Sequence, residues 1–311
     1  MSIFSNILGA FGHGSKEKIL VICGPTAVGK SDLAVAVALK FDGEVISADS
    51  RQVYRGLDIG SEKITSAEMR GVPHHMLDIC DPSTRYTAAQ FQTDGEAILR
   101  DIIARGKLPI VAGGSGLYID AVLRRASFPN VKPNPKFRAT LAKKSDKDLW
   151  NVLYHHDPER AENIDCTNRV RLIRALEIID ALGNIPKTQN SADKYQTLWV
   201  GLDMNDEELK QKIFYRLQKK LDNGSLVQET RDLIARGMSF ERLNELGLEY
   251  KIVGEHIQKL INAEEMAEKL FYEIWHFAKR QRTWFQKNQE IYWFHPFLDR
   301  TEIMDTITKW I

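Results

Sequence analysis

The stretch Gly24-Pro-Thr-Ala-Val-Gly-Lys-Ser31 decides the fold of this chain. It fills every fixed position of the pattern G-x-x-x-x-G-K-[S/T], follows the apolar run 19–23 and precedes the helical pattern 32–40. This context is typical of a phosphate cradle, because glycines let backbone N–H groups surround an anion at a helix N-terminus. A glycine-rich turn without a ligand is the alternative, and the complete match disfavours it. The residues expected to contact the phosphates are Gly24, Pro25, Thr26, Ala27, Val28, Gly29, Lys30 and Ser31.

Within this cradle two side chains have separate tasks. Lys30 would reach the outer phosphate, and the Ser31 hydroxyl would bind Mg²⁺. The sequence therefore predicts that the chain binds a phosphorylated small molecule.

The composition is that of an ordinary globular protein. The chain has 311 residues, of which 43% are hydrophobic and 27% charged, and its formal net charge is +1. This balance excludes a uniformly basic nucleic-acid binder but leaves local basic patches open. The three cysteines form no CxxC pair, so we expect reduced cytoplasmic thiols rather than disulfides or a zinc ribbon. No run approaches the roughly 18 apolar residues of a membrane span.

The order of apolar runs predicts an α/β fold with an insertion. Strands are expected at 19–23, 44–48 and 108–112, with a helix at 91–105 before the third. Prolines and a charged helical stretch follow Leu123, and a strand pattern returns at 197–202. We expect a P-loop NTPase-like parallel-sheet core, an inserted, mainly helical domain and an N-terminal extension that packs as a short amphipathic turn rather than a signal peptide. Their expected bounds are 18–124 plus 196–311 for the core with its C-terminal helices (206–220, 228–236 and 263–286), 125–195 for the insertion and 1–17 for the extension.

Two further segments follow strands and should meet the phosphate cradle at the same sheet edge. Gly113–Gly116 contributes backbone N–H groups and the Ser115 hydroxyl, although a GGSG sequence alone is usually a flexible turn. Asp49 follows the second strand, where a carboxylate suits a general base. A turn or helix-capping aspartate is the alternative for Asp49. Gln52 could form a hydrogen bond with the acceptor.

A basic segment near the C-terminus points to nucleic acid. Residues 275–288 (WHFAKRQRTWFQKN) interleave cations with aromatic rings, which suits an RNA backbone and unstacked bases. The alternative is a solvated basic helix with a buried aromatic stripe. A second cluster, Arg169, Arg171 and Arg174, lies on a helix expected in the insertion. The pairs His74-His75 and His155-His156 lack partners at metal-ligand spacing, so neither predicts a metal site.

Several blocks together resemble one family, the bacterial tRNA isopentenyltransferases (tRNA dimethylallyltransferases). They are GPTAVGKS (24–31), SADSRQVYRGLDIGSEK (47–63), PHHMLDI (73–79), YTAAQF (86–91), PIVAGGSGLYI (109–119), RVRLIRALEI (169–178) and AKRQRTWF (278–285). The resemblance implies transfer of a dimethylallyl group from dimethylallyl diphosphate to N6 of adenosine 37, next to the anticodon, in tRNAs reading codons that begin with U. Diphosphate would leave from the cradle with Mg²⁺ as cofactor.

The resemblance also implies roles for single residues. Asp49 would be the base, Ser115 would contact the leaving group, and Arg216 would lie near the diphosphate. The adenine would enter a channel that meets the donor from the opposite end, and the insertion would close on the anticodon stem. The residues expected to contact tRNA are Asp49, Ser50, Arg51, Gln52, Ser115, Arg138, Val170, Arg171, Leu172, Ile173, Arg174, Lys279, Arg280, Gln281, Arg282, Thr283 and Trp284. The expected partners are the tRNA anticodon stem-loop and dimethylallyl diphosphate, with no membrane, no obligate protein partner and no need for more than a monomer.

The sequence departs from the family pattern at three places. Ser31 stands for the commoner threonine, the segment 222–226 is short, and Gly247–Lys251 replaces a motif of the A-I-G-Y-K-E type. The last two bear on tRNA choice and affinity more than on the reaction. Two other functions stay open: a P-loop small-molecule kinase, in which Asp49 would deprotonate an alcohol, and a non-catalytic tRNA-binding paralogue.

Overall fold

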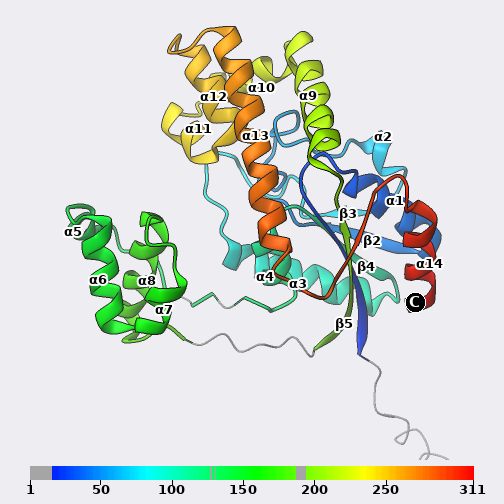
Figure 1. The fold of residues 1–311 in the computed structure, drawn as a ribbon, viewed down its shortest axis with the longest axis horizontal. Coiled ribbons are helices and arrows are strands. Elements are labelled where there is room, and N and C mark those ends of the chain that lie inside the picture. The colour runs from blue at the N-terminus through cyan, green and yellow to red at the C-terminus, as the bar shows by residue number, and fades with distance from the viewer. Residues whose placement is uncertain (1–15, 127, 130, 187–193) are drawn as a thin grey trace, which may run out of the picture. The chain divides into compact units, whose positions relative to one another are not determined.

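A parallel sheet organises the larger part of the molecule (Figure 1). The computed structural model describes residues 16–126, 128–129, 131–186 and 194–311. Within them six strands pair in the order β3-β2-β4-β1-β5-β6, and every pair is parallel. The strands are β1 (Glu17–Cys23), β2 (Gly43–Ser47), β3 (His74–His75), β4 (Leu108–Gly113), β5 (Tyr195–Leu202) and β6 (Ile291–Phe294). The predicted α/β class is confirmed.

The apolar runs of the sequence became the central strands. The three expected strands before residue 125 are β1, β2 and β4, and the strand expected at 197–202 is β5. All five residues of β2 are buried, as parallel strands covered on both faces require. Strands β3 and β6, which have two and four residues, were not predicted.

Helices cover both faces of the sheet. Leu20 and Ile22 of β1 belong to a core that also contains buried residues of α1 (Lys30–Phe41) and α14 (Arg300–Trp310). Because side chains alternate along a strand, Val21 points to the opposite face. There, α3 (Ala88–Ala104) and α4 (Gly116–Val122) contact β4. The helix expected at 91–105 is α3.

The C-terminal helices follow β5. The breaks expected at 222–225 and at Gly247 separate α9 from α10 and α11 from α12. Gly247 has a φ of 73°, a left-handed value that glycine adopts without strain. The elements of this region are α9 (Asp206–Asp222), α10 (Ser225–Ala235), α11 (Phe240–Leu246), α12 (Leu248–Ile257) and α13 (Ala263–Phe285), and the short α2 (Ser66–Met69) lies earlier in the chain.

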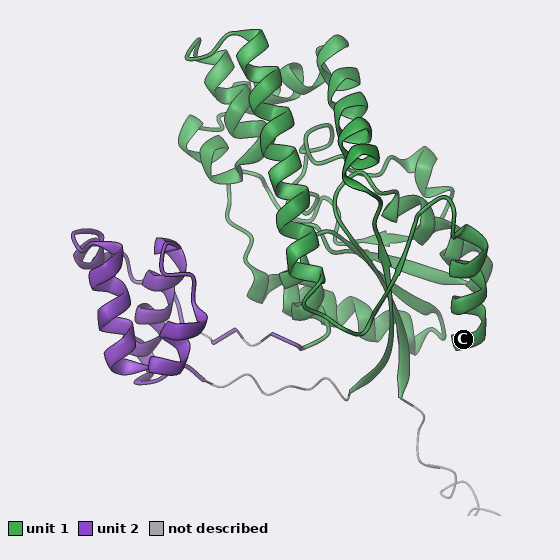
Figure 2. Cartoon of the chain, in the orientation of Figure 1, with its two compact units in different colours: residues 1–124, 191–311 green, residues 125–190 purple. Residues whose placement is uncertain are grey.

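The chain divides into two compact units (Figure 2). The first comprises residues 1–124 and 191–311, and the second residues 125–190. The second unit has four helices among its described residues and its own core around Leu149, Leu153, Leu172 and Leu176. They are α5 (Pro135–Ala142), α6 (Asp146–His156), α7 (Pro158–Asn163) and α8 (Arg169–Leu182). The turn expected in the N-terminal extension falls on residues 1–15, outside the described residues.

Candidate functional site

The loop after β1 has the backbone of a phosphate cradle. Gly24 has a φ of 139°, and a Cβ there would lie 2.2 Å from the carbonyl oxygen of Leu202. Gly29, with a φ of 88°, is the N-cap of α1. Both positions therefore require glycine. The loop ends at the N-terminus of α1, where the backbone N–H groups favour a bound anion.

Lys30 faces this loop at the first position of α1. Its ammonium donates a hydrogen bond to the carbonyl oxygen of Pro25. Burial lowers the pKa of Lys30 to about 8, and the positive charge of Arg216 acts in the same direction while Asp49 opposes it. Desolvation thus destabilises the charged form of this lysine relative to the neutral form, and a bound anion would stabilise the charged form again.

The second glycine loop contacts the Asp49 segment, as the shared sheet edge predicts. The backbone N–H of Ser115 donates to the carbonyl oxygen of Ala48 over 3.1 Å. The backbone N–H of Ser50 donates to the hydroxyl oxygen of Ser115, also over 3.1 Å. A Cβ on Gly113 would lie 2.1 Å from the carbonyl oxygen of Ala48, so glycine is required for this approach.

Asp49 has the geometry of a turn aspartate. Its Oδ1 accepts hydrogen bonds from the backbone N–H groups of Arg51 at 2.7 Å and Gln52 at 3.3 Å. Among the described residues, none donates a hydrogen bond to Oδ2. The carboxylate also lines the same cavity as Lys30. The turn role and a chemical role are therefore compatible, because each uses a different oxygen.

The Gln52 carboxamide forms hydrogen bonds within the protein. Its Oε1 accepts from the Ser47 hydroxyl at 2.9 Å, and its Nε2 donates to the carbonyl oxygens of Ser61 and Glu62. Its side chain therefore connects the end of β2 to the loop 57–63.

That loop carries Glu62 into the cavity. Glu62 forms ion pairs with Arg216 at 2.7 Å and with Lys220 at 2.9 Å. Burial raises the pKa of Glu62, but the charges of Lys220 and Arg216 outweigh burial, so the net shift is downward. Arg216 and Lys220 lie one turn apart on α9, and Arg216 lines the same cavity as Lys30.

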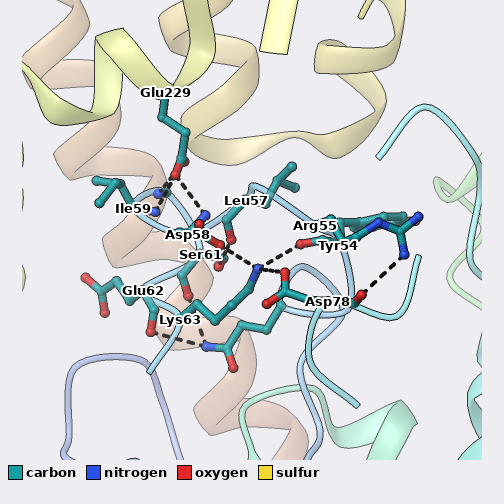
Figure 3. Close-up of polar contacts among 12 residues, drawn as sticks. Tyr54, Arg55, Leu57, Asp58, Ile59, Ser61, Glu62, Lys63, Asp78 and Glu229 are labelled. Atoms are coloured by element: carbon teal, nitrogen blue, oxygen red, sulfur yellow. Dashed lines mark hydrogen bonds and ion pairs between the residues drawn. The ribbon is translucent and has the colours of Figure 1, made fainter. Parts of the chain in front are cut away.

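A carboxylate on α10 holds the loop 57–63 in place (Figure 3). Glu229 accepts hydrogen bonds from the backbone N–H groups of Asp58, Ile59 and Gly60 at 2.6–3.0 Å. The Tyr250 hydroxyl donates to the same carboxylate at 2.9 Å. This arrangement gives the altered segment 247–251 a structural task, because Tyr250 packs under the loop.

Lys63 secures the other end of the loop (Figure 3). Its ammonium donates to the carbonyl oxygen of Tyr54 at 2.8 Å and pairs with Asp58 at 2.6 Å and Asp78 at 2.5 Å. The loop is thus held at both ends by charged side chains.

Glu249 is a cavity residue that sequence reasoning missed. It lines the cavity with Lys30 and Asp49, and burial raises its pKa to about 7. Nothing in the sequence around a glutamate in the first turn of a helix indicates that the side chain will line a cavity. Only the packing of α12 against the loop reveals it.

A second cavity adjoins the first. Both are lined by Arg51, Leu248 and Phe277, and the second also by Lys251 and Arg280. The two cavities therefore share wall residues, and the second has both basic and acidic side chains in its lining. That they form one channel entered from two ends stays a prediction.

The basic block of α13 contains exposed side chains and side chains that are bonded within the protein. Lys279 and Arg280 are exposed, and each cation lies about 6 Å from a ring centroid, at 6.0 Å from Trp275 and 5.9 Å from Phe277 respectively. Thr283 is exposed, and Trp284 is 37% exposed. These four positions are open to a partner.

Gln281 and Arg282 have other contacts. Gln281 is buried and bonded to both glycine loops. The Arg282 guanidinium pairs with Asp206 at 2.5 Å and donates to Asp203 at 2.9 Å. The protein itself occupies these two side chains, and the tRNA contacts expected at both positions stay predictions.

The expected tRNA residues of the second unit also divide. Val170 is 77% exposed and Arg171 is exposed, whereas Leu172 is fully buried in the core. Helix periodicity turns the Leu172 side chain inward, and a tRNA contact at this position stays a prediction. Ile173 is partly buried against the same core.

Arg138 and Arg174 are half-exposed and share one buried carboxylate. Glu177 accepts from Arg138 at 2.9 Å and from Arg174 at 2.7 Å. Burial raises the pKa of Glu177, but these two arginines and the backbone N–H of Asn134 lower it to about 2.

The first histidine pair has partners within the fold. His75 lies 2.7 Å from the Glu44 carboxylate, and His74 contacts the carbonyl oxygen of Val72. Across the described part of the chain, no three histidine, cysteine or acidic side chains gather as a metal site would require. In the same residues, no helix has the length and apolar character needed to cross a bilayer.

A parallel sheet with a glycine-lined phosphate cradle after β1 and a carboxylate after β2, on the far side of β4, defines a P-loop α/β enzyme. Family models described as IPP transferase and isopentenyl transferase match residues 52–288 and 17–82. The chain belongs to the IPP transferase family, and the resemblance seen in its motifs is confirmed.

Curated relatives and solved structures agree. A tRNA dimethylallyltransferase of Pelotomaculum thermopropionicum is 40% identical over 96% of this chain and 97% of the relative. The crystal structure of a tRNA isopentenylpyrophosphate transferase from Bacillus halodurans has a TM-score of 0.72 and 35% identity, covering 94% of this chain and 96% of that one. A eukaryotic dimethylallyltransferase acting on tRNA has a TM-score of 0.79 and 27% identity, covering 94% and 78%.

Proposed function

We propose that this protein transfers a dimethylallyl group from dimethylallyl diphosphate to N6 of adenosine 37 in tRNAs reading codons that begin with U. The observation that carries the proposal is that the cavity lined by the phosphate cradle and Asp49 shares wall residues with a second cavity, whose lining includes Lys251 and Arg280. Because tRNA is the acceptor, the reaction belongs in the cytoplasm.

The cradle binds the leaving group in this proposal. Lys30, the backbone of residues 24–31 and Arg216 surround a diphosphate whose negative charge grows as the C1–O bond breaks. The Ser31 hydroxyl is a hard oxygen ligand of the kind that Mg²⁺ takes together with phosphate oxygens and water. A single protein ligand suffices for such a site, so the residues present fit the metal. When bound, Mg²⁺ would supply further charge neutralisation on the diphosphate.

Asp49 takes the proton in the bond-forming step. The adenine N6 attacks C1 of the dimethylallyl group, diphosphate departs with the electron pair of the C1–O bond, and N6 loses one proton to Oδ2 of Asp49. The backbone N–H groups on Oδ1 fix the orientation of the carboxylate.

The adenine has to leave the anticodon-loop stack to reach this point. Extrusion costs a few kcal/mol, and less for a base that is already unpaired. The groove lined by Arg51, Lys251 and Arg280 offers cations for the backbone beside the extruded base. The half-exposed Trp284 offers a ring for stacking.

Mass spectrometry of nucleosides tests the proposal. The protein is incubated with dimethylallyl diphosphate, Mg²⁺ and tRNA from a strain lacking the modification, and digested RNA is examined for N6-dimethylallyladenosine. Formation of this nucleoside at position 37 supports the proposal. Binding of tRNA without product would favour the non-catalytic paralogue, and phosphorylation of small alcohols by ATP would favour the kinase.

A further inference from the structure

Gln281 lies between the two glycine loops, although it belongs to the segment that looks like an RNA-binding block. Its Oε1 accepts a hydrogen bond from the backbone N–H of Thr26 at 2.8 Å. Its Nε2 donates to the carbonyl oxygen of Gly114 at 3.0 Å. The side chain is 6% exposed, so each bond replaces water that cannot reach these groups.

The second glycine loop is shaped for two side chains of α13. A Cβ at Gly114 would lie 2.2 Å from Nε2 of Gln281. A Cβ at Gly116 would lie 2.1 Å from Nε1 of Trp284, three residues further along α13. The two side chains share one face of the helix. Both loop glycines therefore have no room for a side chain because α13 packs against them.

The contacts of Gln281 continue to the proposed base. Gly114 precedes Ser115, whose N–H donates to Ala48 and whose hydroxyl accepts from Ser50. Asp49 lies between Ala48 and Ser50 in the chain. One carboxamide thus connects the loop that would bind the diphosphate with the loop that supports the carboxylate.

We propose that Gln281 is a positioning residue that fixes the distance between the phosphate cradle and Asp49. Because Gln281 belongs to α13, this distance is coupled to the position of the helix that also carries the RNA-facing cations. The inference rests on the proposed function for its kinetic part. Gln281 touches neither reacting atom. Its effect is exerted through Thr26 and Gly114.

The test replaces Gln281 by a side chain of similar length that cannot form either bond. In Gln281→Met, the buried Thr26 N–H and Gly114 carbonyl lose their partner, so the cradle and the second loop can move apart. We expect diphosphate affinity, measured by calorimetry, to fall about 10-fold, and kcat for transfer to fall by at least as much, the usual scale for buried groups left unpaired. The KM for tRNA should change less than twofold, because the exposed face of α13 is unaltered.

Two further variants keep the result interpretable. Gln286→Met changes an exposed glutamine just past α13 that contacts neither loop, and it should behave as the wild type. Gln281→Glu keeps an acceptor for Thr26 and loses the donor to Gly114, so it separates the two bonds should Gln281→Met fail to fold. Its transfer rate should fall as well.

The outcomes are distinct for the two proposals. Unchanged diphosphate affinity and kcat in a folded Gln281 variant would overturn the positioning role, and so would a loss confined to the KM for tRNA. Failure of the wild type to prenylate tRNA would overturn the proposed function. The calorimetric comparison would still decide the role of Gln281 in shaping the cradle.

Discussion

Asp49 shows how one carboxylate can have a structural and a chemical task. Oδ1 holds the turn through two backbone N–H groups, whereas Oδ2 receives no hydrogen bond from the described residues. A substitution that changes only the second oxygen can therefore separate the tasks.

Asp49→Asn is that substitution. The asparagine carbonyl oxygen still accepts from Arg51 and Gln52, so the turn is kept, but the amide accepts no proton. We expect the transfer rate to fall by ~10²–10⁴-fold, the usual scale for a general base, with little change in tRNA affinity. Single-turnover kinetics and filter binding measure the two quantities. Near-normal turnover would contradict the assignment of Asp49 as the base.

Lys30 gives a prediction with a definite sign in pH. Its pKa is lowered to about 8, so the cation that attracts diphosphate is lost as the pH rises through that value. Diphosphate affinity should therefore decrease above pH 8. Lys30→Met should bind diphosphate ~10–100-fold more weakly at pH 7, the scale for a hydrogen bond to a charged group. In the variant, the part of the pH dependence centred near 8 should disappear. Calorimetry at several pH values checks both expectations, and identical pH profiles would show that another group is responsible.

At the scale of elements, the loop 57–63 and helix α13 both depend on carboxylates that accept from neighbouring segments. Glu229 joins α10 to the loop, and Asp203 and Asp206 join α9 and its preceding turn to α13. These contacts bring together segments that lie 76–171 residues apart in the sequence.

Glu229→Ala should loosen the loop that presents Glu62 to Arg216. Three backbone N–H groups and the Tyr250 hydroxyl lose their acceptor, and water can reach only the exposed ones. We expect the free energy of unfolding to fall by about 1–3 kcal/mol. Amide exchange at residues 58–60 should become faster. Glu229→Gln, which keeps one accepting oxygen, should lie between the alanine variant and the wild type. Protection at these amides equal to that of the wild type would argue against Glu229 as their acceptor.

Arg280 and Arg282 are neighbours with opposite expected effects. Arg280→Ala removes an exposed cation, so it should weaken tRNA binding and reduce the slope of log K against log salt by about 1. Arg282→Ala leaves Asp203 and Asp206 without their partner, so it should lower thermal stability by about 1–2 kcal/mol with little change in that slope. Filter binding at several salt concentrations and thermal melts compare the pair. A reduced salt slope for Arg282→Ala alone would reverse the assignment.

These residues also show which features of the fold and of the site could be predicted from the sequence. The P-loop, the strands around it and the approach of Ser115 to the Asp49 segment follow from local patterns, because glycine, apolar runs and strand ends have local causes. The segment KRQRTWF contains exposed cations, the buried Gln281 and the ion-paired Arg282. This division depends on Gly114 and Asp203, which lie far away in the sequence. Glu249 could not be found for the same reason, since its cavity is made by distant segments.

At the scale of the whole molecule, each unit has its own core and its own buried ion group. Residues 125–190 are held partly by Glu177, whose side chain is 1% exposed and paired with two arginines. The phosphate cradle belongs entirely to the other unit. Damage to one unit should therefore leave the chemistry of the other measurable.

Glu177→Gln should unfold the second unit while sparing the cradle. The variant removes the negative charge that Glu177 supplies to Arg138 and Arg174, and breaking such a pair costs about 3 kcal/mol when the arginines are partly exposed. We expect loss of amide protection within 135–182 and weaker tRNA binding, with diphosphate affinity unchanged. Asp180→Asn, an exposed acid on the same helix, is the matched control and should behave as the wild type. Because the pKa of Glu177 in the fold is about 2 and its ordinary value is 4.5, the wild-type unit keeps this stabilisation above pH 4.5 and loses it as the pH falls towards 2. The glutamine variant should lack this acid-dependent step, and an equal fall in diphosphate affinity would show that the two units do not fold independently.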